Sequence, residues 1–67
     1  MTQETMTAAE YKAAREKLNL TQAGLAALLG VTRETVTRRE QGAKITDEAA
    51  LAIASLVAAR VDESEGI

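Results

Sequence analysis

The chain has 67 residues, with no cysteine, histidine or proline, and Tyr11 is its one aromatic residue. At this length it forms a single domain, and a domain of about 60 residues buries only about 60% of its unfolded surface. The missing residue types exclude disulfides, zinc–thiolate sites and a histidine general base. We therefore expect a core of aliphatic side chains, with no metal, no cofactor and no enzyme active site.

Charge is divided unevenly along the chain, whose formal net charge is −2. Residues 1–46 contain seven basic and five acidic residues, whereas residues 47–67 contain one basic and five acidic residues. This division favours a protein that contacts a polyanion with one face. No apolar run approaches the roughly 20 residues that cross a membrane, and the chain does not begin with a secretory signal pattern. We expect a soluble, cytoplasmic protein without a membrane partner.

The first predicted helix begins after Thr7. Thr7 and Glu10 have the spacing of a capping box, in which a hydroxyl and a carboxylate accept from amides at a helix start. One face of this helix carries Tyr11, Ala14, Arg15 and Leu18 at helical spacing. Arg15 is unexpected on a stripe that faces the core, because a buried cation is costly without a carboxylate partner.

Two further helices are predicted with only a short turn between them. Thr21 caps a helix over residues 22–29, which ends at Gly30 because glycine adopts the left-handed conformation without strain. Thr32 then caps the next helix, and this spacing is that of a helix-turn-helix. The apolar residues of the first of these two helices are Leu25, Ala26, Leu28 and Leu29.

The later helix of this pair covers residues 33–41 and ends at Gly42. At helical spacing its exposed arc carries Arg33, Glu34, Thr37, Arg38 and Gln41. Val36 and Arg39 point toward the core instead. Glu40 lies at the boundary between the two arcs, and we expect it to form an ion pair with Arg15.

A fourth helix is predicted to begin after Thr46. Residues 49–61 are apolar nearly all round this helix, which indicates cover on more than one side. We expect a second copy of the chain to cover one side, through Leu51, Ile53, Leu56, Val57 and Val61. The domain is predicted to span residues 7–61, with flexible ends at residues 1–6 and 62–67.

The caps, turns and apolar positions together form one pattern: Arg15, Leu20-Thr21-Gln22, Leu25-Ala26, Leu29-Gly30-Val31-Thr32, Val36-Thr37-Arg38 and Glu40-x-Gly42. Over about residues 9–55 this pattern resembles the Cro/Xre family of helix-turn-helix DNA-binding domains. The resemblance implies an all-α, lambda-repressor-like bundle of four helices, or five, and a buried Arg–Glu pair at Arg15 and Glu40. Gly24 and Arg39 depart from the family, which has a better helix former and an apolar residue at these positions.

The resemblance also implies roles in DNA binding, since such domains place the start of the third helix in the major groove. Base contacts are expected from Arg33, Glu34, Thr37 and Arg38. Glu34 has an equally good alternative role, as a helix-dipole partner and i,i+4 partner of Arg38. Phosphate contacts are expected from Gln22, Thr32, Arg39, Gln41 and Lys44.

The expected function is that of a homodimeric repressor, acting on its own operon in a phage or mobile element. Its partners would be a pseudo-palindromic DNA operator and a second copy of the chain, and no small-molecule ligand is expected. The alternative is an antitoxin or other protein-binding module, whose apolar fourth helix and acidic end contact a partner protein. An enzyme is disfavoured, because no clustered catalytic pair is visible in the sequence.

Overall fold

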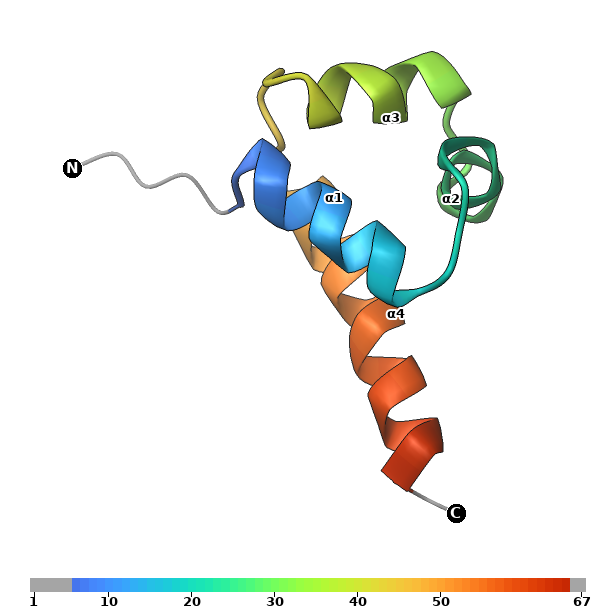
Figure 1. Cartoon of the computed structure of the whole chain (residues 1–67). Coiled ribbons are helices and arrows are strands. Elements are labelled where there is room, and N and C mark those ends of the chain that lie inside the picture. The colour runs from blue at the N-terminus through green and yellow to red at the C-terminus, as the bar shows by residue number, and fades with distance from the viewer. Residues whose placement is uncertain (1–5, 66–67) are drawn as a thin grey trace, which may run out of the picture.

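The structure is a computed structural model that describes residues 6–65, with side chains described for residues 6–60. It contains four helices and, among the described residues, no strand: α1 (Ala8–Lys17), α2 (Gln22–Leu29), α3 (Arg33–Glu40) and α4 (Asp47–Glu65). The prediction of an all-α bundle that contains a helix-turn-helix is confirmed. In Figure 1, α1 lies against α4, α3 spans the top of the molecule and α2 closes one side.

Each helix begins after a threonine, as the sequence predicts. Thr7, Thr21, Thr32 and Thr46 each accept a hydrogen bond at Oγ1 from the amide three residues later, at 3.1, 2.9, 3.2 and 3.1 Å. At Thr7 the capping box is complete, because the Glu10 carboxylate accepts from the Thr7 amide at 3.0 Å. The four helix starts are therefore specified locally, by one residue type used four times.

A residue in the left-handed region follows the end of each of the first three helices. These residues are Asn19, Gly30 and Gly42, with φ of 57°, 74° and 113°. After each of them the next amide donates back across the helix end, and the bond from Val31 to the Ala26 carbonyl measures 3.0 Å. This closure satisfies carbonyls that a helix end leaves free. The glycine stops were predicted, whereas the role of Asn19 was not.

The centre of the core contains one fully buried side chain from each helix: Tyr11, Leu25, Val36 and Ile53. Leu18, Ala26, Ile45, Ala49 and Ala50 complete the buried set around them. Because every helix contributes to one cluster, removing any of these side chains would loosen all four helices together.

Ile53 corrects the predicted dimer surface. Its side chain is 0% exposed, since it fills the centre of its own core, so the prediction that it contacts a second copy is wrong. Leu56 and Val57 are half-buried and pack against the same core, while Leu51 is 68% exposed. The side chain of Val61 lies outside the described residues.

Of the four apolar residues named for α2, Leu28 is 60% exposed, because the buried arc of the helix runs through Leu25, Ala26 and Leu29 and leaves Leu28 at its margin. Met6 packs against the core, and α4 continues to Glu65, past residue 61, where the predicted domain ends. The remaining parts of the predicted flexible ends, residues 1–5 and 66–67, lie outside the described residues.

Candidate nucleic-acid interface

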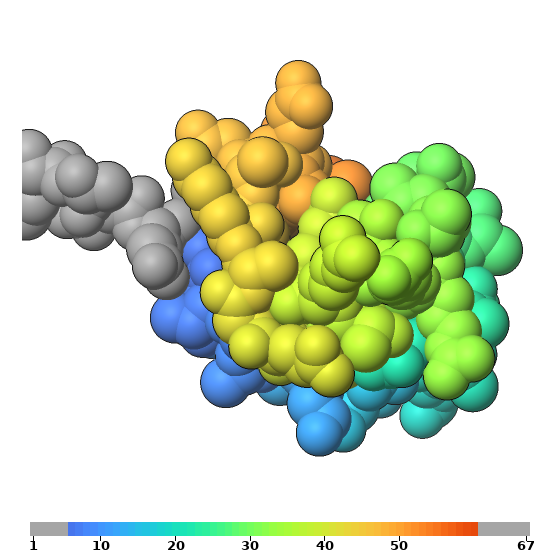
Figure 2. All heavy atoms as spheres, turned by 90° about the horizontal axis from the view of Figure 1, so that it is seen from above, coloured from blue at the N-terminus to red at the C-terminus, as the bar shows by residue number. Residues whose placement is uncertain are grey.

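The outer surface of α3 carries polar side chains and lies at the centre of the face seen in Figure 2, which looks down onto this helix. Arg33, Glu34 and Arg38 are exposed on it, while Val36 on the opposite side of the helix is buried. One helix thus has an anchored inner side and an outer side free to meet a partner. Thr32 and Gln41 at the two ends of α3, and Lys44 in the connection to α4, are exposed as well.

Glu34 and Arg38 form an ion pair on this surface. Arg38 Nη2 donates to Glu34 Oε2 at 2.9 Å, and the two side chains stay 71% and 70% exposed for Glu34 and Arg38. The acidic residue precedes the basic one by four positions, which is the favourable order on a helix. An exposed pair of this kind adds little to stability, so it does not hold the fold together.

A second ion pair lies beneath α3 and is largely buried. Arg15 Nε donates to Glu40 Oε2 at 2.6 Å, and the two side chains are only 13% and 5% exposed. This is the pair that the sequence predicts. Arg15 also donates from Nη1 to the Leu20 carbonyl at 2.7 Å, so one guanidinium joins α1, the α1–α2 connection and α3.

The buried pair continues into a chain of hydrogen bonds that reaches the outer surface. Gln22 Nε2 donates to Glu40 Oε1 at 3.0 Å, and Gln22 Oε1 lies 3.0 Å from the Thr37 hydroxyl. That hydroxyl also lies 3.1 Å from the Arg33 carbonyl, so its single hydrogen has two acceptors within the protein. Gln22 and Thr37, which were predicted to contact DNA, are half-buried and bonded to each other. Sequence spacing gives no signal for this contact between α2 and α3.

This hydrogen-bond chain keeps its carboxylate charged. Burial acts to raise the pKa of Glu40, but hydrogen bonds from Arg15 and Gln22 and the charges of Arg15 and Lys12 outweigh it, so the pKa lies below the ordinary value. The hydrogen bond to Glu40 in turn raises the pKa of Arg15. Both residues therefore stay charged, and their ion pair and hydrogen bonds hold α3 in place against α1 and α2.

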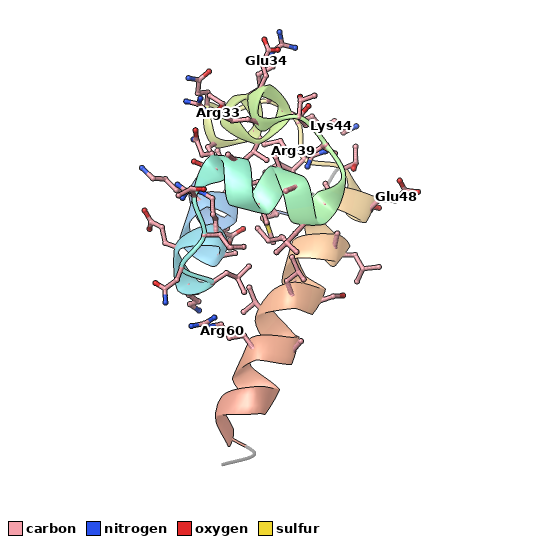
Figure 3. The ribbon with its side chains drawn as sticks, turned by 90° about the vertical axis from the view of Figure 1, so that its right-hand side faces the viewer. Arg33, Glu34, Arg39, Lys44, Glu48 and Arg60 are labelled. Carbon is pink, nitrogen blue, oxygen red and sulfur yellow. The ribbon has the colours of Figure 1, made fainter. Side chains whose placement is uncertain are left out.

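Arg39 takes a position that the sequence indicates only in part. Its guanidinium lies over the Tyr11 ring, 5.7 Å from the ring centre, and its Nη1 donates to the Tyr11 hydroxyl at 3.0 Å. Both residues were predicted to face inward, but the contact between them was not predicted. The contact is chemically favourable, because a buried phenol needs a hydrogen-bond partner and an aromatic ring attracts a cation. Figure 3 shows Arg39 on the side of α3 opposite Arg33, with Lys44 on the same side as Arg39.

The described residues hold no group of three acidic or other metal-ligating side chains that is placed to bind a metal ion. Within that same part of the chain, no helix is long and apolar enough to cross a membrane. What the structure does assemble is a polar helix surface, supported from below by a buried ion pair and bordered by cations.

Comparison with known proteins agrees with this geometry. A family model described as helix-turn-helix matches residues 12–63, which covers all of α2 and α3 and most of α1 and α4. No curated protein and no solved structure shows significant similarity to the chain. Domains of this family are DNA-binding regulatory domains and are not typically enzymatic. The chain thus belongs to the helix-turn-helix family, in its Cro/Xre-type form.

Proposed function

We propose that this protein is a sequence-specific repressor that binds double-stranded DNA as a homodimer. Two copies bind the two half-sites of a pseudo-palindromic operator, with α3 of each copy in the major groove, and the bound dimer blocks polymerase. The regulated operon is of phage or mobile-element type and contains the gene of the protein itself, which acts at the nucleoid in the cytoplasm. The observation that carries the proposal is the exposed polar face of α3 above a buried ion pair.

Base reading falls to the exposed side chains of α3. Arg33 and Arg38 have guanidinium forks that match the O6 and N7 acceptors of guanine, and Glu34 has a carboxylate that matches the amino group of cytosine. The Thr37 hydroxyl is bonded to Gln22, so Thr37 contributes its methyl group, which suits the methyl group of thymine.

Phosphate contacts come from the border of the same face. Exposed Thr32, Gln41 and Lys44 supply side chains there, and Arg39 has guanidinium donors beyond the one given to Tyr11. The carboxamide of Gln22 is engaged with Glu40 and Thr37. Gln22 therefore meets the phosphate through its backbone N–H at the start of α2, where a helix has free amides.

Dimerisation is supported by α4. Leu51 is 68% exposed on the side of this helix that faces away from Ile53. A large apolar side chain at that exposure loses unfavourable contact with water when a second copy covers it. Binding two half-sites about 34 Å apart on one side of the duplex then requires both copies.

Selection of bound sequences from a random pool of duplexes tests the proposal. We expect a palindromic motif for the wild type and loss of preference at one base pair per half-site in Arg33→Ala, worth about 1–3 kcal/mol. Lys44→Ala should weaken binding evenly across sequences and lower the salt dependence by about one phosphate contact.

The matched control is Arg60→Ala. Arg60 is an exposed arginine at the end of the molecule away from α3, as Figure 3 shows, and it lies half a helical turn from the Leu51 side of α4. We expect the wild-type motif and affinity for this variant. Selection of no motif by the wild type, or equal losses in Arg33→Ala and Arg60→Ala, would refute the proposal.

A further inference from the structure

Glu34 and Arg38 are joined in a way that leaves both of them able to bind a ligand. Their contact uses one oxygen and one nitrogen, Glu34 Oε2 and Arg38 Nη2, 2.9 Å apart. Among the described residues neither side chain makes another hydrogen bond, so Glu34 Oε1 can still accept while Arg38 Nη1 and Nε can still donate. The pair thus offers donors next to an acceptor on the exposed surface of α3.

The major-groove edge of a G·C base pair has the complementary order. Guanine presents two acceptors, N7 and O6, and its paired cytosine presents the N4 amino donor beside them. We infer that Glu34 and Arg38 read one G·C base pair as a unit, with Arg38 donating to guanine and Glu34 accepting from the cytosine of the opposite strand. This inference rests on the proposed function, and it merges the two alternative roles of Glu34 into one.

The carboxylate then supplies selectivity that a lone arginine lacks. At an A·T pair Arg38 still finds the N7 acceptor of adenine, but Glu34 faces the O4 acceptor of thymine. Glu34 Oε1 would then be desolvated against an acceptor without gaining a hydrogen bond, which makes the wrong pair costly even though Oε2 keeps its bond to Arg38. Glu34 is therefore a specificity-determining residue that lowers affinity for DNA in general and restores it at G·C.

Glu34→Gln tests this inference, because it keeps the side-chain shape and removes the charge. We expect Glu34→Gln to bind unrelated duplexes more tightly than the wild type and to lose about tenfold of its preference for G·C at one position. Arg38→Ala should lose preference at the same position, and the double variant should lose no more than Arg38→Ala alone. Far-ultraviolet circular dichroism should show unchanged folding, since the pair is exposed.

Glu48→Gln is the matched control. Glu48 is the second residue of α4, as Glu34 is the second residue of α3, and both are exposed, so the two variants remove the same charge from the same helical position. We expect the wild-type motif for Glu48→Gln. If Glu34→Gln binds all duplexes more tightly but selects the wild-type motif unchanged, the inference is overturned while the proposed function stands. Failure of the wild type to select any motif would instead overturn the proposed function.

Discussion

Two arginine–glutamate pairs in this small domain have the same chemistry but opposite surroundings. The side chains of Arg15 and Glu40 are 13% and 5% exposed, whereas those of Arg38 and Glu34 are 70% and 71% exposed. Water screens the second pair and competes for its hydrogen bonds, so its net contribution to stability is small. Arg15 and Glu40 are shielded from water, so when one of them is removed, water cannot solvate the charge of the other. That charge is then buried without a partner, which is costly.

Glu40→Ala should therefore lower the free energy of unfolding by about 3–5 kcal/mol. The variant leaves the Arg15 guanidinium unpaired and removes the acceptor of the Gln22 carboxamide. Urea denaturation followed by circular dichroism measures the change. Glu34→Ala is the control, and we expect it to cost less than about 1 kcal/mol. Similar losses in the two variants would mean that burial does not set the strength of these pairs.

The same residue predicts a dependence of stability on pH. The folded-state pKa of Glu40 lies below the ordinary value of 4.5, so the unfolded chain binds a proton more readily than the folded one. The stabilisation from this carboxylate is fully present above about pH 4.5 and is lost as the pH falls through the lower, folded-state pKa. Glu40→Gln lacks this contribution. The difference in stability between wild type and Glu40→Gln should therefore shrink as the solution is acidified, and a constant difference would contradict this assignment.

At the scale of the helices, local signals predicted the elements well. The starts of α2 and α3 follow from Thr21 and Thr32, and the end of α2 follows from Gly30. The end of α4 was placed too early because the apolar pattern stops at Val61, and an apolar pattern reports burial rather than helicity. The residues after Val61 include no glycine or proline before Gly66, and the helix continues to Glu65.

Partners between helices were predicted less well than the helices themselves. The pair of Arg15 with Glu40 was predictable because a cation on an inward stripe needs a carboxylate. The bond of Gln22 to Thr37 was not, because either polar side chain can equally bond to water and only the packing of α2 on α3 brings them to 3.0 Å. Ile53 was misassigned for a related reason, since a helix that is apolar all round does not indicate which side faces its own core.

Helix α2 contains a glycine, Gly24, that weakens the helix and is not needed for a turn or a left-handed conformation. Gly24 lies inside α2, and a Cβ added there would come 3.2 Å from Thr21 Oγ1 and 3.5 Å from Leu20 Cδ2. The other three helices have the same threonine cap with a Cβ at the equivalent position, in Glu10, Thr35 and Ala49. The close approach to a capping hydroxyl is thus tolerated throughout this chain.

Gly24→Ala should therefore stabilise the protein, by up to about 1 kcal/mol, because alanine restricts the unfolded chain and favours a helix. In a domain of this size that change raises the melting temperature by roughly 4–8 °C. Thermal unfolding by circular dichroism provides the measurement. Gly30→Ala is the contrasting variant, and it should destabilise, because Gly30 has a φ of 74°. A lower melting temperature for Gly24→Ala would mean that Thr21 cannot shift to accept the methyl group.

The whole molecule has two ends with different surfaces. Figure 1 places α3 across one end, while the later part of α4 extends beyond the other helices at the opposite end. Large apolar side chains are also distributed unevenly, since Leu28 on α2 and Leu51 on α4 are the ones that stay exposed in the described part of the chain. The proposed function requires a dimer that leaves α3 of both copies free for DNA, and we expect contact through α4 to meet this requirement.

Leu51→Glu should weaken dimerisation and leave the fold of each copy intact. Leu51 is 68% exposed, so a charged side chain there remains hydrated in the single copy, but it would be desolvated in a dimer that buries this side of α4. Sedimentation equilibrium should show a dimer for the wild type and a shift toward monomer for the variant. Binding to a two-half-site duplex should weaken much more than binding to a single half-site, because only the former depends on both copies.

Leu28→Glu separates this effect from a general loss of exposed apolar surface. Leu28 is 60% exposed, a value close to that of Leu51, but it lies on α2 rather than α4. We expect this variant to sediment as the wild type does. If the two variants dissociate the dimer equally, the interface includes α2. If the wild type is a monomer both free and on DNA, a homodimer through α4 is wrong.

Ile53→Ala gives the remaining contrast, because the Ile53 side chain is 0% exposed. We expect this variant to unfold at a lower urea concentration, with a loss of about 2–5 kcal/mol in the free energy of unfolding, instead of producing a folded monomer.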